Sequence, residues 1–322
     1  MTGREPQVRA PAFRVPMAHS GSTLAGVAFC FIAAVCFSFK SILIKIAYTY
    51  HVDASTLLTL RMGLALPFFL VMAAWSRRSP RPAPLTRRQW GAVLVLGFSG
   101  YFLASYLDFL GLQYISAGLE RLTLFLYPTI VVILSAILFK RRIQGYQTFA
   151  LILSYIGIVL VFAEAIGATG RPSGFWLGTG LVFSSAVIYS IYLIVSAELV
   201  GTIGPVRFTA YAMSVACLLT FAQFALTHSL DALRLPQPVY VMSLVMATVS
   251  TVLPAWLMSE GLRRVGANQA ALVGSVGPVV TIALGYVFLN EPMTALQVFG
   301  AVLVLAGVTL VTVKRSAVGP ID

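Results

Sequence analysis

The sequence predicts an all-α polytopic membrane protein with ten transmembrane helices, arranged as two inverted repeats of five helices. The first observation is composition: 59% of the 322 residues are hydrophobic and 10% are charged, whereas a soluble domain carries about 25% charged residues. With a mean hydropathy of +0.90, the chain has too little polar surface for a water-exposed globule. The second observation is a series of long apolar runs. The third is an internal repeat.

Each apolar run is close to the roughly 20 residues that a helix needs to cross the hydrocarbon core of a bilayer. The connections between the runs are short, so no soluble domain fits between them. The runs predict ten spans: Leu24–Tyr48, Ser55–Trp75, Trp90–Leu112, Ala117–Phe139, Gln147–Ala163, Phe175–Ala197, Phe208–Thr227, Val239–Ser259, Ala267–Leu289 and Leu296–Val313. Residues 24–163 then form the first repeat and 175–313 the second, between tails at 1–23 and 314–322.

Basic residues predict the orientation of the spans. If the amino terminus is cytoplasmic, only Arg171 and Arg234 fall in external segments. Cytoplasmic segments then hold Arg4, Arg9, Arg14, Arg77, Arg78, Arg81, Arg87, Arg88, Lys140, Arg141, Arg142, Arg207, Arg263, Arg264, Lys314 and Arg315. This asymmetry follows the positive-inside rule and places both termini in the cytoplasm, with no cleaved signal peptide. The net charge of +12 is thereby explained by topology, and no nucleic acid is expected as a partner.

The internal repeat aligns Gly111–Phe162 with Gly261–Thr312 at a shift of 150 residues, without a gap. The identical pairs are Gly111/Gly261, Leu112/Leu262, Ala117/Ala267, Leu122/Leu272, Pro128/Pro278, Gln147/Gln297, Phe149/Phe299 and Gly157/Gly307. Because five spans is an odd number, the two copies must insert with opposite orientations. Inverted repeats are a recurring architecture of transporters, in which a central site opens alternately to each side of the membrane.

These two copies resemble the EamA-type repeats of the drug/metabolite transporter superfamily. The resemblance is most specific in Gly111–Pro128, Gly261–Pro278 and the turn Asn290-Glu291-Pro292. It implies ten helices, cytoplasmic termini, a central cavity and the movement of small metabolites such as amino acids, often by export. Members often carry an acidic turn in both copies, whereas Arg141 stands in the first copy here, so any role of that acid attaches to Glu291 alone.

Six charged residues fall within the predicted spans, all in the outer half of the first copy: Lys40, Lys45, Arg61, Asp108, Glu120 and Arg121. A charge at the centre of a membrane helix costs about 2.5–3.5 kcal/mol on insertion scales, so such groups usually face a partner or a polar cavity. The second copy does not reproduce them. We therefore expect Lys40 and Arg121 to contact an anionic group of a substrate. Asp108 and Glu120 would orient these cations or bind a substrate ammonium.

A structural alternative stays open for the same charges. Arg61, Asp108, Glu120 and Arg121 could form a salt-bridge cluster that only stabilises the fold, while Lys45 extends its ammonium to the external interface. The sequence favours function for Lys40 and Asp108, and both interpretations stand equally for Arg61 and Glu120. Adjacent residues on a helix point about 100° apart, so Glu120 and Arg121 are expected to contact different spans.

Helix breakers and aromatic residues add weaker predictions. Pro128 and Pro278 lie mid-span at matched positions, and Gly277 precedes Pro278. Matched interruptions are typical of a binding site at the membrane midplane, although kinks needed only for packing would look the same. Tyr189 and Tyr192 are expected to line the cavity. The small residues Gly157, Gly300 and Gly307 are expected to allow close contact between helices.

No catalytic motif, cofactor motif or paired metal spacing occurs in the sequence. We expect a secondary transporter in the cell membrane that exports a small polar metabolite, such as an amino acid or organic anion, by alternating access. Its partners would be the bilayer and the substrate, with or without a coupled proton or other ion. The rivals are an intramembrane enzyme, which would use Asp108 and Glu120, and a scaffold or sensor that does not transport.

Overall fold

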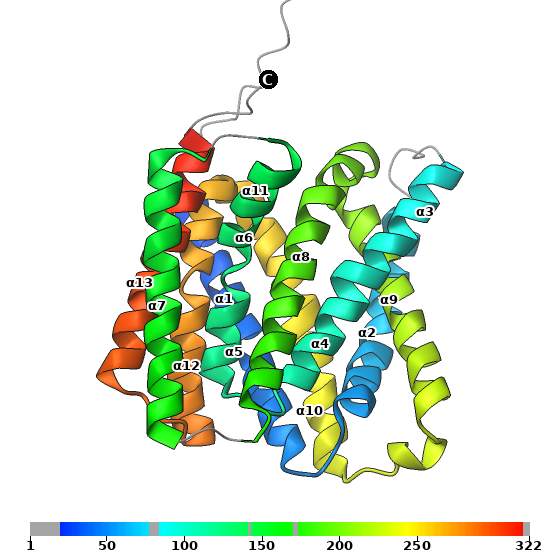
Figure 1. Ribbon diagram of the computed structural model, residues 1–322. Coiled ribbons are helices and arrows are strands. Elements are labelled where there is room, and N and C mark those ends of the chain that lie inside the picture. Colours follow the sequence, from blue (N-terminus) through cyan, green and yellow to red (C-terminus); the bar gives the residue numbers. More distant parts are fainter. Residues whose placement is uncertain (1–19, 77–83, 141–142, 170–172, 318–322) are drawn as a thin grey trace, which may run out of the picture.

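The computed structural model describes residues 20–76, 84–140, 143–169 and 173–317, and within these ranges the regular structure is entirely helical (Figure 1). Continuous apolar runs give the long helices, and α2 keeps its helical course through Pro67. The first half contains α1 (Ser20–Tyr48), α2 (Ala54–Ser76), α3 (Arg87–Leu96), the π-helix η1 (Gly97–Leu103), α4 (Ala104–Gly111), α5 (Ala117–Leu124), α6 (Tyr127–Leu138) and α7 (Gly145–Thr169).

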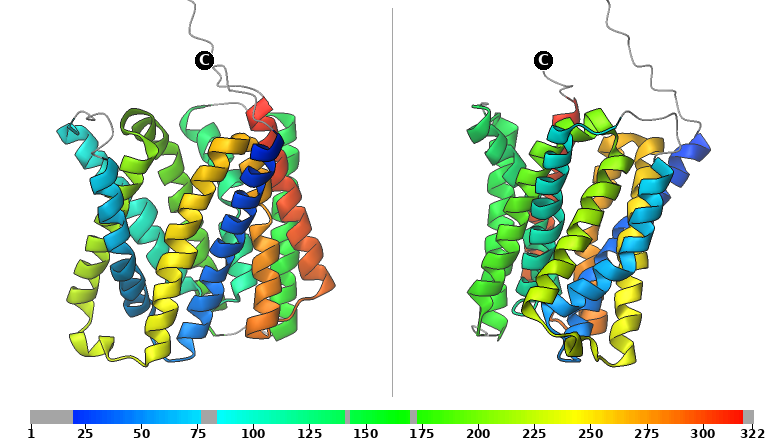
Figure 2. Two further views of the ribbon diagram at one scale, coloured as in Figure 1. Left: turned by 180° about the vertical axis from the view of Figure 1, so that it is seen from behind. Right: turned by 90° about the vertical axis from the view of Figure 1, so that its right-hand side faces the viewer.

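The second half has a similar order of elements, with the single helix α11 in place of α4 and α5 and with one added 3₁₀ helix. It contains α8 (Phe175–Ile203), α9 (Pro205–Thr227), the short 3₁₀ helix η2 (Leu230–Leu233), α10 (Gln237–Ala247), the π-helix η3 (Thr248–Val252), α11 (Leu253–Gly274), α12 (Gly277–Leu289) and α13 (Ala295–Ala317). The start of α1 and the end of α13 lie at the same end of the bundle (Figure 2).

Eight helical segments of the described chain are long and apolar enough to cross a membrane, and they coincide with the first eight predicted spans. The ninth and tenth predicted spans fall on shorter apolar stretches, Gly277–Leu289 and Ala295–Leu310. The ninth span is shorter than predicted because α11 continues past the predicted end of the eighth span, through the expected turn. The tenth falls on α13. The count of ten spans and the inverted relation of the repeats therefore stay predictions.

The chain nevertheless reverses its direction within α11. A methyl group placed on Gly274 would lie 3.9 Å from the terminal carbon of Met258. In a straight helix these two residues would stand about 24 Å apart along the axis. The last part of α11 therefore lies beside its first part, which is the course that a turn between two spans requires.

Large apolar side chains cover much of the outer surface of the bundle. Val71 is 69% exposed, Phe149 59% and Phe288 54%. Soluble monomers rarely expose contiguous apolar surface of this kind, whereas lipid tails solvate it. The surface and the helix lengths together make this chain an integral membrane protein.

Helices of one half pack against helices of the other. The helix α7 pairs with α13, and α2 with α9, at opposite sides of the bundle (Figure 1). Between these pairs α1 packs on α11 and α12, while α8 packs on α4 and α6 (Figure 2). The end of α6 and the start of α7 lie at one end of the bundle, and the end of α12 and the start of α13 lie at the other (Figure 1).

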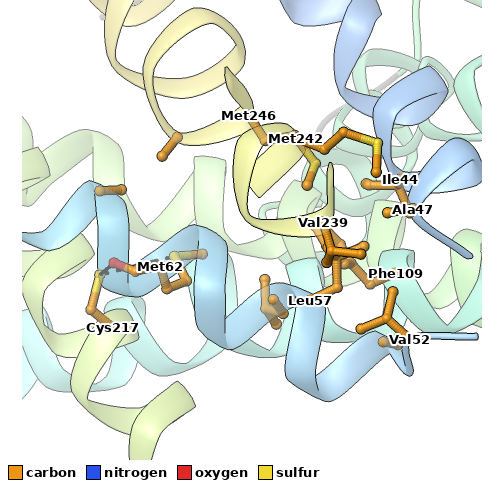
Figure 3. Close-up of a cluster of buried hydrophobic side chains, with 14 of the residues drawn as sticks. Ile44, Ala47, Val52, Leu57, Met62, Phe109, Cys217, Val239, Met242 and Met246 are labelled. Carbon is orange, nitrogen blue, oxygen red and sulfur yellow. Dashed lines mark hydrogen bonds between the residues drawn. The ribbon is translucent and has the colours of Figure 1, made fainter. Parts of the chain in front are cut away.

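The largest apolar core lies where α1, α2, α4 and α10 meet (Figure 3). Leu57 and Phe109 are fully buried in it, and Met242 and Met246 fill the space between them and α1. The thiol of Cys217 donates to the carbonyl oxygen of Met62 at 3.3 Å, which ties α9 to α2. This core borders the charged side chains described next and holds their helices in place.

Candidate functional site

Three of the predicted site residues meet in one buried ion cluster, formed by Lys40, Ser41, Asp108 and Glu120. The helix α1 carries Lys40 and Ser41, α4 carries Asp108 and α5 carries Glu120. The Lys40 Nζ lies 2.6 Å from Asp108 Oδ2 and 3.5 Å from Glu120 Oε1. The Ser41 hydroxyl donates to Glu120 Oε2 at 2.7 Å. One ammonium therefore holds two carboxyl groups from two different helices.

The members of this cluster are buried, so each charge needs a partner to be stable in the folded protein. The Asp108 residue is 3% exposed and Glu120 is fully buried. A buried charge without a partner is strongly unfavourable, so removing one member of such a pair usually destabilises a protein by about 3–5 kcal/mol. The contacts of Lys40 are thus already taken by Asp108 and Glu120, which fits the structural alternative better than a direct contact between Lys40 and a substrate anion.

Arg61 lies beside this cluster on α2 and has a different environment. Its Nε and Nη2 donate to the Thr251 hydroxyl at 3.2 and 3.1 Å, and its guanidinium lies 5.5 Å from the centre of the Phe109 ring. Thr251 belongs to η3, so Arg61 joins the first half of the chain to the π-helix of the second. Within the described ranges Arg61 forms no salt bridge. It therefore does not pair with Asp108 or Glu120, as the structural alternative had it.

Lys45 caps a helix end within the protein. Its Nζ donates to the carbonyl oxygens of Leu112 and Ile115 at 3.3 and 2.9 Å. These carbonyls follow the end of α4, where backbone acceptors have no helical donor. The ammonium therefore satisfies the end of α4, whereas the sequence favoured an extension to the external interface.

Arg121 stands apart from the buried ion cluster, although its neighbour Glu120 belongs to it. Its buried Nε has no hydrogen-bond partner, and no salt bridge to its guanidinium occurs in the described part of the chain. A methyl group placed on Gly277 would lie 3.0 Å from Arg121 Nη2, so the guanidinium rests against the start of α12. A partly buried cation that has no counter-ion among the described residues is available for an anionic ligand.

The predicted helix breakers lie at matched interruptions of two helical spans. The helix α5 ends at Leu124 and α6 begins at Tyr127, while α11 ends at Gly274 and α12 begins at Gly277. These positions differ by the 150 residues of the repeat. Pro128 and Pro278 each lie in the first turn of the helix that follows the break, where a missing amide hydrogen costs nothing.

Two buried serines bind these breaks from the opposite half of the chain. The Ser38 hydroxyl of α1 donates to the carbonyl oxygen of Gly277 at 3.0 Å. The Ser190 hydroxyl of α8 donates to the carbonyl oxygen of Tyr127 at 3.2 Å. Both serines are fully buried, so each break is held by a helix of the other repeat in the same way.

Tyr189 and Tyr192 belong to an aromatic cluster beside Arg121. Their rings stack with centres 5.6 Å apart, and Tyr127 packs edge-on against Tyr189 at 5.5 Å. The Tyr192 hydroxyl donates to that of Tyr101, which lies in η1, at 2.9 Å. Gly100 of η1 permits this approach, because a methyl group there would lie 2.1 Å from the Tyr192 ring. The two tyrosines are therefore packed together rather than open to a large cavity.

A cavity of about 610 Å³ lies at the end of the bundle that holds the α12–α13 turn. Its lining includes Lys45, Tyr48, Ser116 and Leu119, but none of the seven residues that the sequence predicts to contact a substrate. A carboxylate from this turn also lines it: Glu291 accepts hydrogen bonds from the amides of Ala117 at 2.8 Å and Gly118 at 3.3 Å. Glu291 thereby caps α5 of the other repeat. Its first-copy counterpart Arg141 lies outside the described residues.

Sequence reasoning missed Ser41, Thr251 and the capping contact of Glu291. A serine next to a membrane lysine is a usable signal for Ser41. Thr251 carries no such signal, because its contact depends on α2 lying beside η3. Among the described residues no three His, Cys, Asp or Glu side chains are arranged to hold a metal ion.

Comparison with known proteins agrees with the fold and its two halves. The model of the EamA-like transporter family matches residues 24–163 and 176–313. The uncharacterized transporter YcbK of Bacillus subtilis is 33% identical over 285 residues, covering 86% of this chain and 89% of YcbK. The uncharacterized transporter YyaM of the same organism is 26% identical, covering 77% of this chain and 81% of YyaM.

One relative and one solved structure extend over almost the whole length. The uncharacterized transporter sll1319 of Synechocystis is 22% identical, covering 92% of this chain and 95% of sll1319. A solved crystal structure covers 94% of this chain, with a TM-score of 0.61 and 18% identity, and supports the fold alone. On the family match and the YcbK similarity, this chain is a membrane transporter that belongs to the EamA-like transporter family.

Proposed function

We propose that this protein is a secondary transporter that moves a small polar metabolite with an anionic group, an amino acid or organic acid, by alternating access. Export across the cell membrane, with both termini in the cytoplasm, is the direction and orientation that the family resemblance and the positive-inside count favour.

The unpaired guanidinium of Arg121 is the observation that carries this proposal. Lys40 is held by two carboxyl groups, and Arg61 by Thr251. Arg121 alone of these three cations lacks both a salt bridge and a hydrogen bond in the described part of the chain. It also lies against the first residue of α12. Starts of broken membrane helices commonly face the anionic groups of transported substrates.

The matched helix breaks support alternating access. Ser38 and Ser190 bind the two breaks by equivalent hydrogen bonds. If the halves are inverted relative to each other, the Ser38 bond takes the surroundings of the Ser190 bond, and the reverse, when the protein opens to the other side of the membrane. When the serine hydrogen bond is released, the helix can straighten or tilt at the break.

The test begins with a ligand screen and ends with a flux measurement. Purified protein is heated with amino acids and organic acids, since a ligand of the folded state raises the Tm. The uptake of a ligand that raises the Tm is then measured in proteoliposomes. The proposal expects saturable flux that is lost in Arg121→Gln and partly kept in Arg121→Lys. The matched control is Arg234→Gln, whose side chain is 86% exposed.

Two outcomes would refute the proposal. Flux of the anionic ligand that persists in folded Arg121→Gln at the wild-type rate removes the assigned site. Chemical conversion of the ligand in the vesicles, without movement of the intact molecule, would instead identify an intramembrane enzyme.

A further inference from the structure

Two carboxyl oxygens of the buried ion cluster have no hydrogen-bond donor. Asp108 and Glu120 together have four carboxyl oxygens, and two of them are satisfied: Lys40 binds Asp108 Oδ2, and Ser41 binds Glu120 Oε2. Asp108 Oδ1 and Glu120 Oε1 are buried and have no hydrogen-bond partner. The Lys40 Nζ is 3.5 Å from Glu120 Oε1, too far for a good hydrogen bond.

The two carboxyl groups also gather around one ammonium, because the Lys40 Nζ lies 2.6 Å from Asp108 Oδ2 and 3.5 Å from Glu120 Oε1. Ionised carboxylates are acceptors only, so two of them cannot form a hydrogen bond. A single proton turns one of the two unsatisfied oxygens into a donor, so that one carboxyl group can donate to the other. Pairs of neighbouring carboxyl groups in buried sites share a proton for this reason.

The charges of the cluster lead to the same result. With both acids ionised, the cluster holds two negative charges against the single positive charge of Lys40. One bound proton makes it neutral, which is the state favoured by burial in a low-dielectric interior. The other charged or titratable groups that act on the pair are Tyr48 of α1, Arg61 of α2 and Arg121 of α5. None of these three donates a hydrogen bond to either carboxyl group.

A cavity lies close to the buried ion cluster. The 610 Å³ cavity is lined by Lys45 and Ser116. Lys45 lies four positions after Ser41 on the same face of α1, at an axial distance of about 6 Å, and Ser116 is the N-cap residue of α5, four positions before Glu120. The carboxyl pair is thus about one helical turn from the cavity wall.

We propose that Asp108 and Glu120 share one proton, and that its release and uptake through this cavity couples transport to a proton gradient. The coupling role rests on the proposed function, whereas the shared proton does not. The proton passes between the carboxyl pair and water in the cavity, and no other bond forms or breaks.

Infrared spectroscopy of the purified protein in lipid tests the shared proton directly. A protonated carboxyl group absorbs separately from a carboxylate, and its band shifts in D₂O when the proton exchanges. We expect one such band in the wild-type protein at neutral pH, and its loss in Glu120→Gln and in Asp108→Asn. The control is Glu291→Gln, which removes a carboxylate that two backbone amides already satisfy, and it should leave the band unchanged.

The wild-type spectrum alone can overturn the proposal, even if a variant fails to fold. Absence of a carboxylic-acid band at neutral pH would show that both groups are ionised. A band that survives both substitutions would place the proton elsewhere and would equally refute the assignment.

Proton coupling is measured separately in proteoliposomes that contain a pH-sensitive dye and the ligand identified by the thermal screen. Wild-type flux should change the internal pH. In Glu120→Gln, whose amide can donate to Asp108 in place of the proton, ligand exchange should continue without any pH change. Proton movement that persists in Glu120→Gln would refute the coupling role. Absence of all flux in the wild type would refute the proposed function while leaving the infrared result intact.

Discussion

The contact between α7 and α13 yields a sharp prediction, because glycines allow the two backbones to touch. A methyl group placed on Gly157 would lie 2.5 Å from the carbonyl oxygen of Gly300, and one placed on Gly300 would lie 2.7 Å from the carbonyl oxygen of Gly157. Ordinary van der Waals contact begins at 3.4 Å. Gly157→Ala therefore requires the helices to separate locally by about 0.9 Å.

The expected magnitude follows from two opposing effects. Alanine in place of a helical glycine stabilises the helix by roughly 0.5–1 kcal/mol. Overpacking of a tight contact destabilises by about 1–3 kcal/mol. We expect Gly157→Ala to lower the free energy of unfolding by about 1–2 kcal/mol in net terms.

A second glycine serves as the matched control. A methyl group on Gly180, inside α8, would meet nothing within 4 Å. Gly180→Ala should therefore raise stability, and the two substitutions should shift the Tm in opposite directions. The measurement is thermal unfolding of each purified variant in the same detergent. If Gly157→Ala proves as stabilising as Gly180→Ala, the close α7–α13 contact does not exist in the protein.

Three further predictions test other contacts. Glu291→Ala removes the cap of α5 and should destabilise the protein by about 1 kcal/mol in thermal unfolding. Glu291→Gln should stay nearer to wild type, because its amide oxygen still accepts hydrogen bonds. Equal losses in the two variants would exclude the capping role. Lys40→Met leaves two buried carboxyl groups without a cation and should cost about 3–5 kcal/mol. Adding Asp108→Asn should recover part of that loss, and additive losses would contradict the ion cluster. Reporter fusions or cysteine labelling at residues 140–142 and 290–292 should report opposite compartments, and labelling from the same side would disprove the inverted repeat.

The spans were predicted from the hydrophobicity of consecutive residues, which is a local property of the chain. Eight of them coincide with helices that can cross a membrane, because the transfer of a span into lipid depends on the composition of about 20 consecutive residues. The turn expected before Ala267 was not visible as a helix end, since α11 continues through it. Short polar stretches between apolar runs can stay helical when neighbouring helices support them, and composition alone does not show this.

The π-helices η1 and η3 were not predicted at all. They occupy matched positions in the two halves, separated by the period of the repeat. Their sequences, Gly97–Leu103 and Thr248–Val252, share no residue pattern that would identify an extra residue in the turn. The contacts that they make, Tyr101 with Tyr192 and Thr251 with Arg61, give each π-helix a partner on another helix.

The sequence by itself determined the membrane class, the positions of the apolar helices, the repeat and the set of charges within the spans, because each depends on residue type and spacing along the chain. Only the tertiary structure decided which charges meet. Lys40 pairs with Asp108 and Glu120, while Arg121, one residue from Glu120, faces another helix and forms no salt bridge among the described residues. The physical reason is that ion pairing falls off over a few ångströms, and the rotation and depth of each helix set those distances through packing with its neighbours.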